Sequence, residues 1–354
     1  MIGRRTGRAV RGGRGRLAAG GAAAGAALLL MTGCTSSGDG PEESRERDRG
    51  SGQAGTGGAA RSAYWVNPDS NAAKAMRVHK ERGEDEKAAL VKKIAEQPVG
   101  AWIRPEDPEG ETRKVTRAAA DAGQSALLVL YNIPHRDCGQ YSQGGFGTAA
   151  EYRAFVDKVA EGIGDRRATV IVEPDSIPHL LQDGCTPGKF HKERYDLLKG
   201  AVERMKEQPR TKVYLDAGNP GWTRDPGALV EPLKRAGIDQ ADGFSLNVSN
   251  FETTKANIAY GRRLSPMIGN KPFVIDTSRN GNGPVKGAQD EEAWCNPKGR
   301  ALGEKPTTRT GEKGVDAYLW IKRAGDSDGE CQGGPKAGSW FPDRALELAK
   351  NARH

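Results

Sequence analysis

The chain has 354 residues and a net charge of +8, but not all of either belongs to the folded protein. Residues 1–33 contain six arginines and no acid, so removing these six positive charges from +8 leaves +2 for the rest. A near-neutral remainder lacks the basic surface typical of nucleic-acid-binding proteins, so we expect no nucleic-acid partner. Residues 62–354 have a globular composition and are numerous enough for one large core.

The first segment is typical of an export signal. Its arginines precede an apolar stretch, Leu17 to Met31, that is too short and too rich in Gly and Ala for a membrane span. The pair Arg4-Arg5 leaves the twin-arginine and general secretory routes both open. The run Met31-Thr32-Gly33-Cys34 resembles the lipobox of bacterial lipoproteins, in which the cysteine is lipidated. We expect a protein anchored by lipid at Cys34 to the outer face of the cell membrane, or alternatively a secreted one.

A linker follows the export signal. Residues 35–61 contain no aromatic or large aliphatic side chain, so they cannot bury enough apolar surface to order themselves. A random coil of this length holds its ends roughly 30 Å apart. The predicted parts are therefore an export signal over 1–33, a lipidated cysteine with its linker over 34–61, and one globular domain over 62–354.

Helix-like segments alternate with apolar, strand-like segments in the globular part. The predicted helices are 84–97, 111–122, 149–163, 189–207, 227–236, 253–264 and 342–351. The predicted strands are 100–103, 128–131, 170–172, 213–215, 243–248, 273–275 and 318–321. Seven to eight such units predict an α/β fold in which parallel strands form a closed or nearly closed, TIM-like barrel. A doubly wound open sheet is the alternative, although the Gly-rich phosphate turn that it favours is missing.

Five of the predicted strands run into acidic residues. These acids are Asp137, Glu173 with Asp175, Asp216, Asp276, and Asp326 with Asp328. An unpaired charge at the edge of an apolar core is costly unless it lines a site. Barrels of parallel strands keep their chemistry at the carboxyl ends of the strands. The acids therefore predict an active site there, with structural ion pairs to Arg136 and Arg279 as the alternative for any single acid.

Six motifs in this region resemble those of the family 6 glycoside hydrolases, a group of cellulases. They are Tyr131-Asn132-Ile133-Pro134-His135-Arg136-Asp137-Cys138, Val172-Glu173-Pro174-Asp175-Ser176, Tyr214-Leu215-Asp216-Ala217-Gly218, Asn247-Val248-Ser249-Asn250, Ile275-Asp276-Thr277-Ser278-Arg279-Asn280-Gly281, and Trp320-Ile321-Lys322 with Asp326-Ser327-Asp328-Gly329. The resemblance implies a distorted β/α barrel that hydrolyses a β-1,4-glucan polysaccharide with inversion and with neither metal nor cofactor. It makes 62–354 the catalytic domain.

The resemblance also implies roles for four acids. Asp175 matches the general acid, and Asp137 matches the acid that tunes it and helps to organise the water. Asp328 matches the base, and Asp216 matches a further active-site aspartate. Inversion needs carboxyl groups about 6.5–9.5 Å apart, so that a water fits beside the anomeric carbon. Acids on different strands of a barrel can meet that requirement.

Eight further positions match substrate-binding residues of the family. Trp102, Trp222 and Trp294 match aromatic platforms, although a single tryptophan is more often a core residue. The other five are Tyr131, Asn219, Asn247, Lys322 and Asp326. The chain departs from the family in three places: Asn219 stands where His is frequent, Asp326 replaces a Glu, and Gln143 stands where a water-holding Ser is expected.

Cysteines and loop lengths complete the expectations. Apart from Cys34, four cysteines allow three pairings, and the resemblance implies Cys138–Cys185 and Cys295–Cys331. The loops after Cys138 and after Asp328 are short, which favours an open cleft and cleavage of internal bonds. The predicted function is therefore an endoglucanase. The alternatives are a catalytically weakened glucan-binding homologue and a tethered sugar-binding lipoprotein.

Overall fold

The structure is a computed structural model that describes residues 62–285 and 293–353. The predicted export signal, Cys34 and the linker lie outside the described residues. None of the helices in the two described ranges combines the length and the apolarity that a membrane crossing requires.

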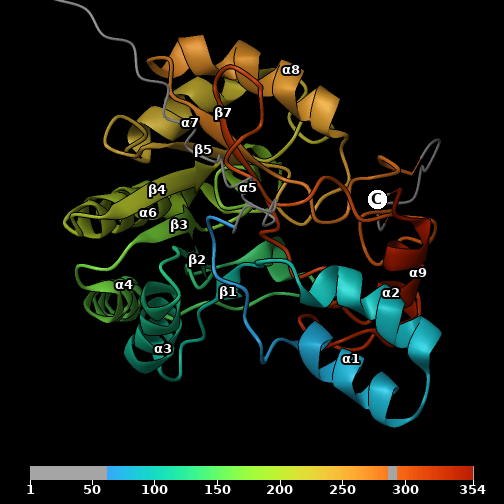
Figure 1. The fold of residues 1–354 in the computed structure, drawn as a ribbon. Helices are drawn as coiled ribbons and strands as arrows, with labels where there is room; N and C mark the ends of the chain where they lie inside the picture. Colours follow the sequence, from blue (N-terminus) through green and yellow to red (C-terminus); the bar gives the residue numbers. More distant parts are fainter. Residues whose placement is uncertain (1–61, 286–292, 354) are drawn as a thin grey trace, which may run out of the picture. The chain divides into compact units, whose positions relative to one another are not determined.

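Seven parallel strands form one sheet whose spatial order follows the order of the chain. They are β1 (Ala101–Trp102), β2 (Ala126–Leu130), β3 (Ala168–Val172), β4 (Thr211–Asp216), β5 (Gly243–Leu246), β6 (Phe273–Asp276) and β7 (Val315–Leu319). The sheet curls into a distorted, TIM-like barrel (Figure 1). The predicted fold class is confirmed. The doubly wound alternative is wrong, because the strand order never reverses as it must at a topological switch point.

The two end strands of the sheet meet at a seam. The backbone N–H of Gly100, just before β1, donates to the carbonyl of Trp320, just after β7, at 2.9 Å. The indole Nε1 of Trp102 donates to the carbonyl of Ile321, also at 2.9 Å. A Cβ at position 100 would lie 2.4 Å from the Ile321 oxygen, so only glycine allows this approach. The barrel is thus nearly closed, as expected.

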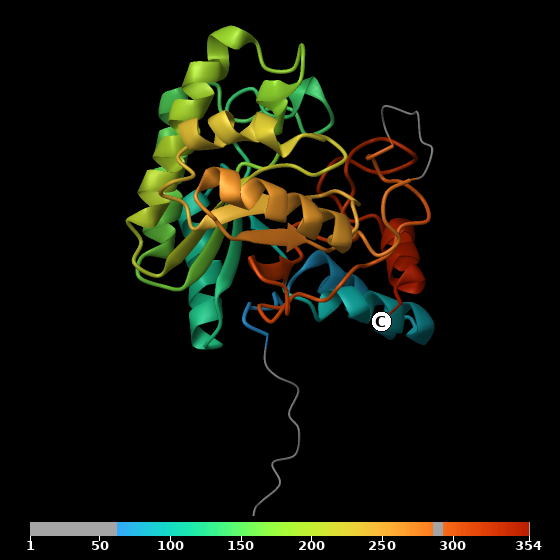
Figure 2. The ribbon, with the colours of Figure 1, turned by 90° about the horizontal axis from the view of Figure 1, so that it is seen from above.

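Helices cover the outside of the barrel. The α-helices are α1 (Asn71–Glu81), α2 (Asp85–Ala95), α3 (Pro108–Asp121), α4 (Ala149–Ile163), α5 (Pro178–Leu181), α6 (His191–Lys206), α7 (Val230–Arg235), α8 (Thr254–Leu264) and α9 (Pro342–Asn351). Figure 2 shows α1, α2 and α9 gathered apart from the helices that follow β1 to β5. The predicted helices are all present. The sequence did not predict α1, whose buried residues are only Ala72 and Ala73 and give little amphipathic signal.

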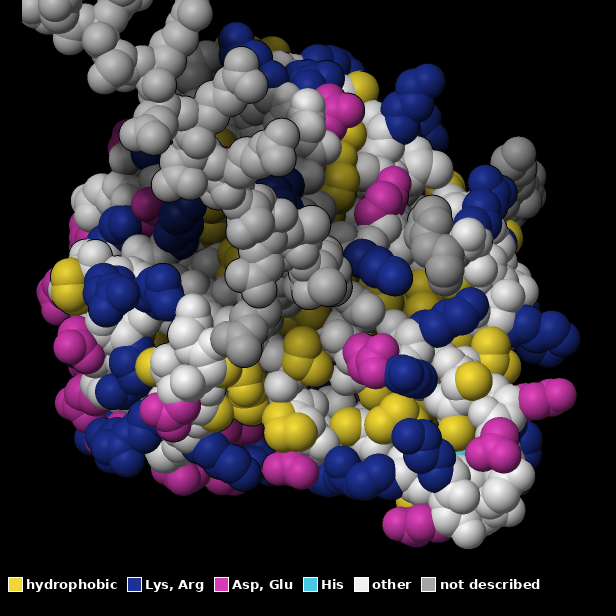
Figure 3. Space-filling view, viewed as in Figure 1, with side chains coloured by type: hydrophobic (Ala, Val, Ile, Leu, Met, Phe, Trp, Pro, Cys, Tyr) yellow, Lys and Arg dark blue, Asp and Glu magenta, His cyan; other side chains and the backbone are white. Residues whose placement is uncertain are grey.

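Apolar side chains fill both faces of the strands. In β2, Leu128 and Leu130 pack against the outer helices, whereas Leu127 and Val129 point into the barrel. This burial on both faces explains why the strands are continuous apolar runs rather than alternating ones. On the face shown in Figure 3, lysine and arginine side chains are interspersed with aspartate and glutamate.

Two disulfides fasten loops at the carboxyl ends of the strands. They join Cys138 to Cys185 and Cys295 to Cys331, which confirms the predicted pairing. The first follows Asp137 directly, and the second connects the neighbours of Trp294 with the segment after Asp328. Both bonds therefore hold loops that carry candidate site residues.

Replacing Cys138 and Cys185 together by serine should lower the free energy of unfolding by about 2–4 kcal/mol, because the bond closes a loop of tens of residues in the unfolded chain. Chemical denaturation measures the change. The Cys295→Ser and Cys331→Ser pair, which closes a loop of similar length, is the matched variant. An unfolding midpoint unaltered in both double variants would contradict the stabilising role.

Candidate active site

A cleft of about 880 Å³ lies at the carboxyl ends of the strands. The last residue of β1, the segments that follow β2, β3, β4, β5 and β7, and the β6–β7 connection all contribute to its lining. Three of the predicted catalytic acids face it, namely Asp137, Asp175 and Asp328. Chain segments far apart in sequence therefore bring carboxyl groups into one space, as the strand-end acids predict.

Asp175 follows β3 and is largely enclosed. Its backbone N–H donates to Oδ2 of Asp216 at 2.9 Å, and its own Oδ2 lies 3.4 Å from the Tyr131 hydroxyl. Burial raises the pKa of Asp175 well above its ordinary value, and the negative charges of Asp216 and Asp137 raise it further. Asp175 is therefore the acid in the cleft best suited to hold a proton near neutral pH.

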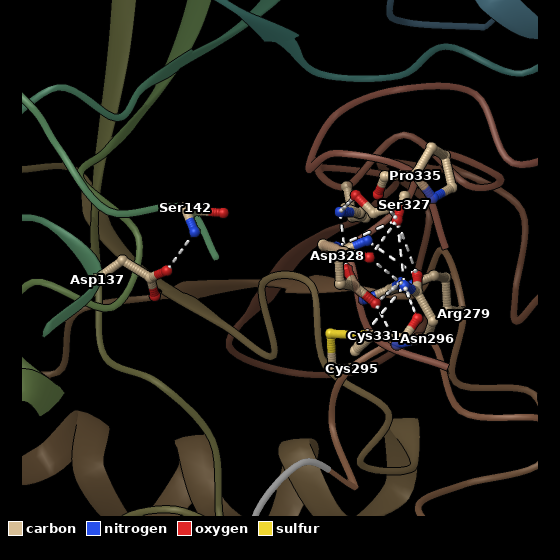
Figure 4. The surroundings of a disulfide bond; sticks show 11 residues. Asp137, Ser142, Arg279, Cys295, Asn296, Ser327, Asp328, Cys331 and Pro335 are labelled. Carbon is tan, nitrogen blue, oxygen red and sulfur yellow. Dashed lines mark hydrogen bonds and ion pairs between the residues drawn. A yellow bond between two sulfur atoms is a disulfide. The ribbon is translucent and has the colours of Figure 1, made fainter. Parts of the chain in front are cut away.

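Asp137 lies on the loop after β2, on the far side of the cleft from Asp328 in the view of Figure 4. The backbone N–H of Ser142 donates to its Oδ2 at 2.6 Å. Burial raises the pKa of Asp137, while this N–H bond and the charge of Arg136 act in the opposite direction. The Arg136 guanidinium itself donates to the carbonyls of Ser142 and Tyr131. The arginine thus braces the loop rather than forming the ion pair considered from the sequence.

Asp328 follows β7 and is held by two cations. Its Oδ2 accepts from Arg279 Nη1 at 2.8 Å and from the Asn296 N–H at 3.0 Å (Figure 4). Its Oδ1 pairs with Lys322 Nζ at 2.8 Å. Burial alone would raise the pKa of Asp328, but Arg279 and Lys322 outweigh it and hold that pKa well below the ordinary range. Asp328 is therefore ionised wherever the protein is folded at ordinary pH.

Three other strand-end acids are buried beneath the cleft and bind backbone N–H groups. Glu173 accepts from Asn132 and Ile133, and thereby ties the β3 exit to the β2 exit. Asp216 accepts from Asp175 and Gly218. Asp276 accepts from residues of three successive loops. Asp216 does not line the cleft, so the structure places this predicted catalytic residue behind Asp175 as a support.

The predicted aromatic platforms all line the cleft and are half-buried. Trp102 packs edge-on against Tyr131, with ring centroids 5.2 Å apart, and Trp222 packs edge-on against His179 at 5.0 Å. Trp294 lies 6.2 Å from the ring of Tyr141. Aromatic faces exposed along a cleft suit the apolar faces of pyranose rings.

Comparison with protein families matches residues 59–352 to Glycosyl hydrolases family 6. The chain belongs to this family. It is 41% identical to Endoglucanase A of Cellulomonas fimi over 296 residues, which cover 82% of this chain and 62% of that protein. It is 38% identical to Endoglucanase 1 of Streptomyces halstedii, over 80% of this chain and 88% of that protein.

Among solved structures, the chain is similar to the endoglucanase Cel6 from Mycobacterium tuberculosis. The two share 42% identity and a TM-score of 0.76, over 82% of this chain and 98% of the other. That protein was solved in complex with methyl-cellobiosyl-4-deoxy-4-thio-β-D-cellobioside. The chain spans 62% and 64% of the length of two of its curated relatives, the Endoglucanase A proteins of Cellulomonas fimi and Thermobispora bispora.

The three departures from the family 6 pattern all line the cleft, and two of them also make supporting contacts. Asn219 uses its Oδ1 to accept from the N–H groups of Gly221 and Trp222 at 3.0 and 3.1 Å, so it shapes the turn that carries a platform. Asp326 pairs with Arg323 at 2.8 Å and accepts from Asn71. Gln143 lines the cleft beside Ser142, so a serine is present one residue earlier than the sequence comparison expected.

One predicted substrate-binding residue is misplaced. Asn247 is 0% exposed and does not line the cleft. Its Nδ2 donates to the carbonyls of Asp276 and Glu252, and its Oδ1 accepts from the Glu252 N–H. Because its amide is engaged by the backbone, Asn247 holds the β5 exit loop behind the cleft wall and does not face a substrate.

Sequence reasoning missed several residues that shape the family 6 cleft. The ion pair between Arg279 and a strand-end acid, considered from the sequence as an alternative, is present with Asp328, but that Arg279 holds an acid lining the cleft was not predicted. His179 lines the cleft and is buried, and burial lowers its pKa to about 4. The loops after β2 and β7 also touch, because Tyr141 packs so closely on Gly329 that a Cβ there would lie 2.3 Å from the tyrosine Cβ. A His four residues after Asp175 in an Asp-Ser motif was the one signal available for His179.

Within residues 62–285 and 293–353, the grouped His, Cys and acidic side chains that lie close enough for a metal ion are Cys138, His179 and Cys185. Both sulfurs of this group belong to a disulfide, which removes the thiolates that a metal would need. We therefore assign no metal to the cleft.

Proposed function

We propose that this family 6 protein hydrolyses internal β-1,4-glucosidic bonds of cellulose or a related β-glucan with inversion of the anomeric carbon. The observation that carries the proposal is a pair of carboxyl groups with opposite pKa shifts in one cleft. The pKa of Asp175 is raised, so this group can donate a proton, whereas that of Asp328 is lowered, so this group is ionised. Acid–base pairs are recognised by environments that push their pKa values apart.

In the proposed reaction, Asp175 gives its proton to the glycosidic oxygen as the bond from that oxygen to C1 breaks. A water attacks C1 from the opposite face and passes a proton towards Asp328. A carboxylate offers about four lone-pair sites. Arg279, Asn296 and Lys322 occupy three of them, so one site on Oδ1 is left to accept from a water. In this proposal Asp137, whose negative charge raises the pKa of Asp175, helps to hold the proton on Asp175 and to organise the water.

The proposed substrate is supported by the aromatic lining of the cleft. Trp102, Trp222 and Trp294 offer ring faces along it, while Tyr131 and Lys322 stand near Asp175 and Asp328. The printed names of the relatives, which are endoglucanases, agree with a β-glucan. Because the chain spans only part of the length of some of them, we base the activity on the site itself.

The mode of attack is tested by viscosity. Carboxymethylcellulose should lose viscosity well before much reducing sugar appears, because both loops flanking the cleft are short and internal cleavage shortens the chains early. The first product followed by NMR should be the α anomer. A stream of cellobiose at constant viscosity would contradict internal attack, and a β anomer would contradict inversion. A protein that binds the glucan without releasing reducing sugar would be the weakened, glucan-binding homologue.

We propose further that the protein is exported and anchored by lipid at Cys34. The support is the arginine-rich segment, the apolar stretch, and the Gly33-Cys34 pair followed by a polar linker. Such a protein would act on polysaccharide outside the cell while held on the membrane by its lipid alone.

Replacing Cys34 by serine should release the protein into the medium, because a lipoprotein signal without its cysteine cannot be lipidated. Fractionation of cells and medium, with metabolic labelling by a fatty acid, measures this. Ser36→Ala is the matched control and should stay labelled on the membrane. Unlabelled wild-type protein in the medium would instead support plain secretion.

A further inference from the structure

Asp276 is the last residue of β6 and is 1% exposed, yet it does not line the cleft. Its Oδ2 accepts from the N–H groups of Ser249 at 3.0 Å and Lys322 at 2.9 Å, and its Oδ1 accepts from that of Ser278 at 2.9 Å. These donors belong to the loops after β5, β7 and β6. Three successive loops of the barrel therefore meet on one buried carboxylate.

Each of the three residues that donate to Asp276 is a cation of Asp328 or is linked directly to one: one is itself such a cation, one is the neighbour of such a cation in the chain, and one binds that cation by a hydrogen bond. Lys322 binds Asp276 through its backbone and Asp328 through its Nζ. Ser278 precedes Arg279, whose Nη1 binds Asp328. The carbonyl of Ser249 accepts from the other terminal nitrogen of Arg279, Nη2. Moving the backbone around Asp276 would thus move both cations of Asp328.

We infer that Asp276 is a positioning residue that holds Lys322 and Arg279 in place and thereby keeps Asp328 ionised for the reaction. The inference rests on the proposed function, in which Asp328 accepts a proton. Asp276 neither lines the cleft nor contacts an acid that does, in contrast to Asp216, which contacts Asp175. The inference therefore gives this buried carboxylate a role.

A carboxylate suits this position because it only accepts hydrogen bonds. An asparagine there would keep one oxygen but turn an NH₂ group towards at least one of the three N–H donors. A buried donor left without an acceptor is strongly unfavourable, so the loops would shift to relieve it. Burial raises the pKa of Asp276, while the N–H groups of Lys322, Ser278 and Ser249 lower it.

The charged groups around Asp276 determine in which direction the pKa of Asp328 should move when Asp276 is replaced. Asp328 faces Arg279 from the β6 exit and Lys322 from the β7 exit, and Asp326 in turn acts on Lys322. Asp276 raises the pKa of Asp216, and Lys322 lowers that of Asp175. Removing the charge of Asp276 without moving anything would lower the pKa of nearby acids. Loosening the two cations would raise the pKa of Asp328, which is the opposite direction.

The test titrates Asp328 in protein labelled with ¹³C at the aspartate carboxyl carbons, assigned with Asp328→Asn. In Asp276→Asn, the midpoint of Asp328 should rise towards about 4, the ordinary value of an aspartate. Between pH 7 and pH 4, kcat/KM of Asp276→Asn on a soluble β-glucan should therefore decrease about twofold more than kcat/KM of the wild type does. The reason is that half of the Asp328 carboxyls in the variant are protonated at pH 4. KM at pH 7 should change less than kcat, because Asp276 itself does not line the cleft, although its partners Ser249 and Lys322 do.

Glu173→Gln is the matched control, because Glu173 is an equally buried acceptor of backbone N–H groups on the other side of the site. It should leave the Asp328 midpoint unchanged. If Asp276→Asn does not fold, Asp276→Glu keeps the charge but displaces the oxygens, and should raise the midpoint as well. A folded Asp276 variant with an unaltered or lowered Asp328 midpoint would overturn the inference. Inactive wild-type protein would instead overturn the proposed function, and the carboxyl titration would still be readable.

Discussion

Replacing Asp175 by asparagine should lower kcat on β-glucans by about 10²–10⁴-fold, the usual contribution of a general acid. The amide cannot give a proton to the leaving glucosyl oxygen. On a glycosyl fluoride the loss should be far smaller, because fluoride leaves without protonation. Initial rates on the two substrates measure the difference. Asp183→Asn, an exposed acid in the same β3–α6 connection, is the control and should keep wild-type rates.

The pH dependence of wild-type activity is a second test of Asp175 as the acid. Because burial and the nearby acids raise the pKa of Asp175, wild-type activity on glucans should be present at low pH and decline as pH rises through that pKa. This decline should disappear with the fluoride substrate. Equal losses on both substrates in Asp175→Asn would remove this residue from the acid role.

The second large effect is expected for Asp328→Asn, which should impair both substrates because water activation is needed for either leaving group. Stability should also fall by about 3–5 kcal/mol, since Arg279 and Lys322 would remain buried without their counter-ion. Asp326→Asn is the matched variant, because its carboxylate pairs instead with Arg323 and should leave the Asp328 pairs in place.

The ion pairs of Asp328 should also make the free energy of unfolding of the wild type depend on pH. Asp328 has a lowered pKa in the folded protein, so its contribution is present above about pH 4, the ordinary value, and is lost as pH falls below it. Asp328→Asn should lack that acid-dependent part. Thermal unfolding of both proteins between pH 3 and pH 7 measures it. Parallel curves would show that the pair adds nothing to stability.

The sequence predicted the ring of strand-end acids because each acid directly follows an apolar run. It could not predict which acids face the cleft, since that depends on the path of the chain after each strand. Asp175 and Asp137 face the cleft and have left-handed backbone, at φ of 70° and 60°, but Glu173 at 46° is buried. Asp216 and Asp276 end their strands in extended backbone and are buried. The family motif placed Asp216 among the catalytic residues, whereas in the fold its carboxylate accepts from the Asp175 N–H and supports that residue.

Loop contacts were the least predictable part of the site. Ser142 reaches the cleft through a loop whose path follows from tertiary hydrogen bonds, such as its own N–H to Asp137, and His179 reaches it from the short helix α5. Arg279 was recognised only as a partner for acids, because its two-sided contact with Asp328 and Ser249 joins segments distant in sequence. Helix boundaries, in contrast, carried local signals, and α4 begins at the capping box of Thr148 and Glu151.

The seam between β7 and β1 is the weakly hydrogen-bonded side of the barrel, and it adjoins the cleft. Elsewhere adjacent strands pair through a parallel ladder, whereas here Gly100 and the Trp102 indole each contribute one hydrogen bond between β1 and the segment after β7. Local opening of the barrel should therefore begin at the seam. Amide hydrogen exchange should be faster at Gly100 than at Val129 within β2. Because the Trp102 indole is bound to the Ile321 carbonyl and also lines the cleft, we expect opening of the seam to displace this wall of the cleft.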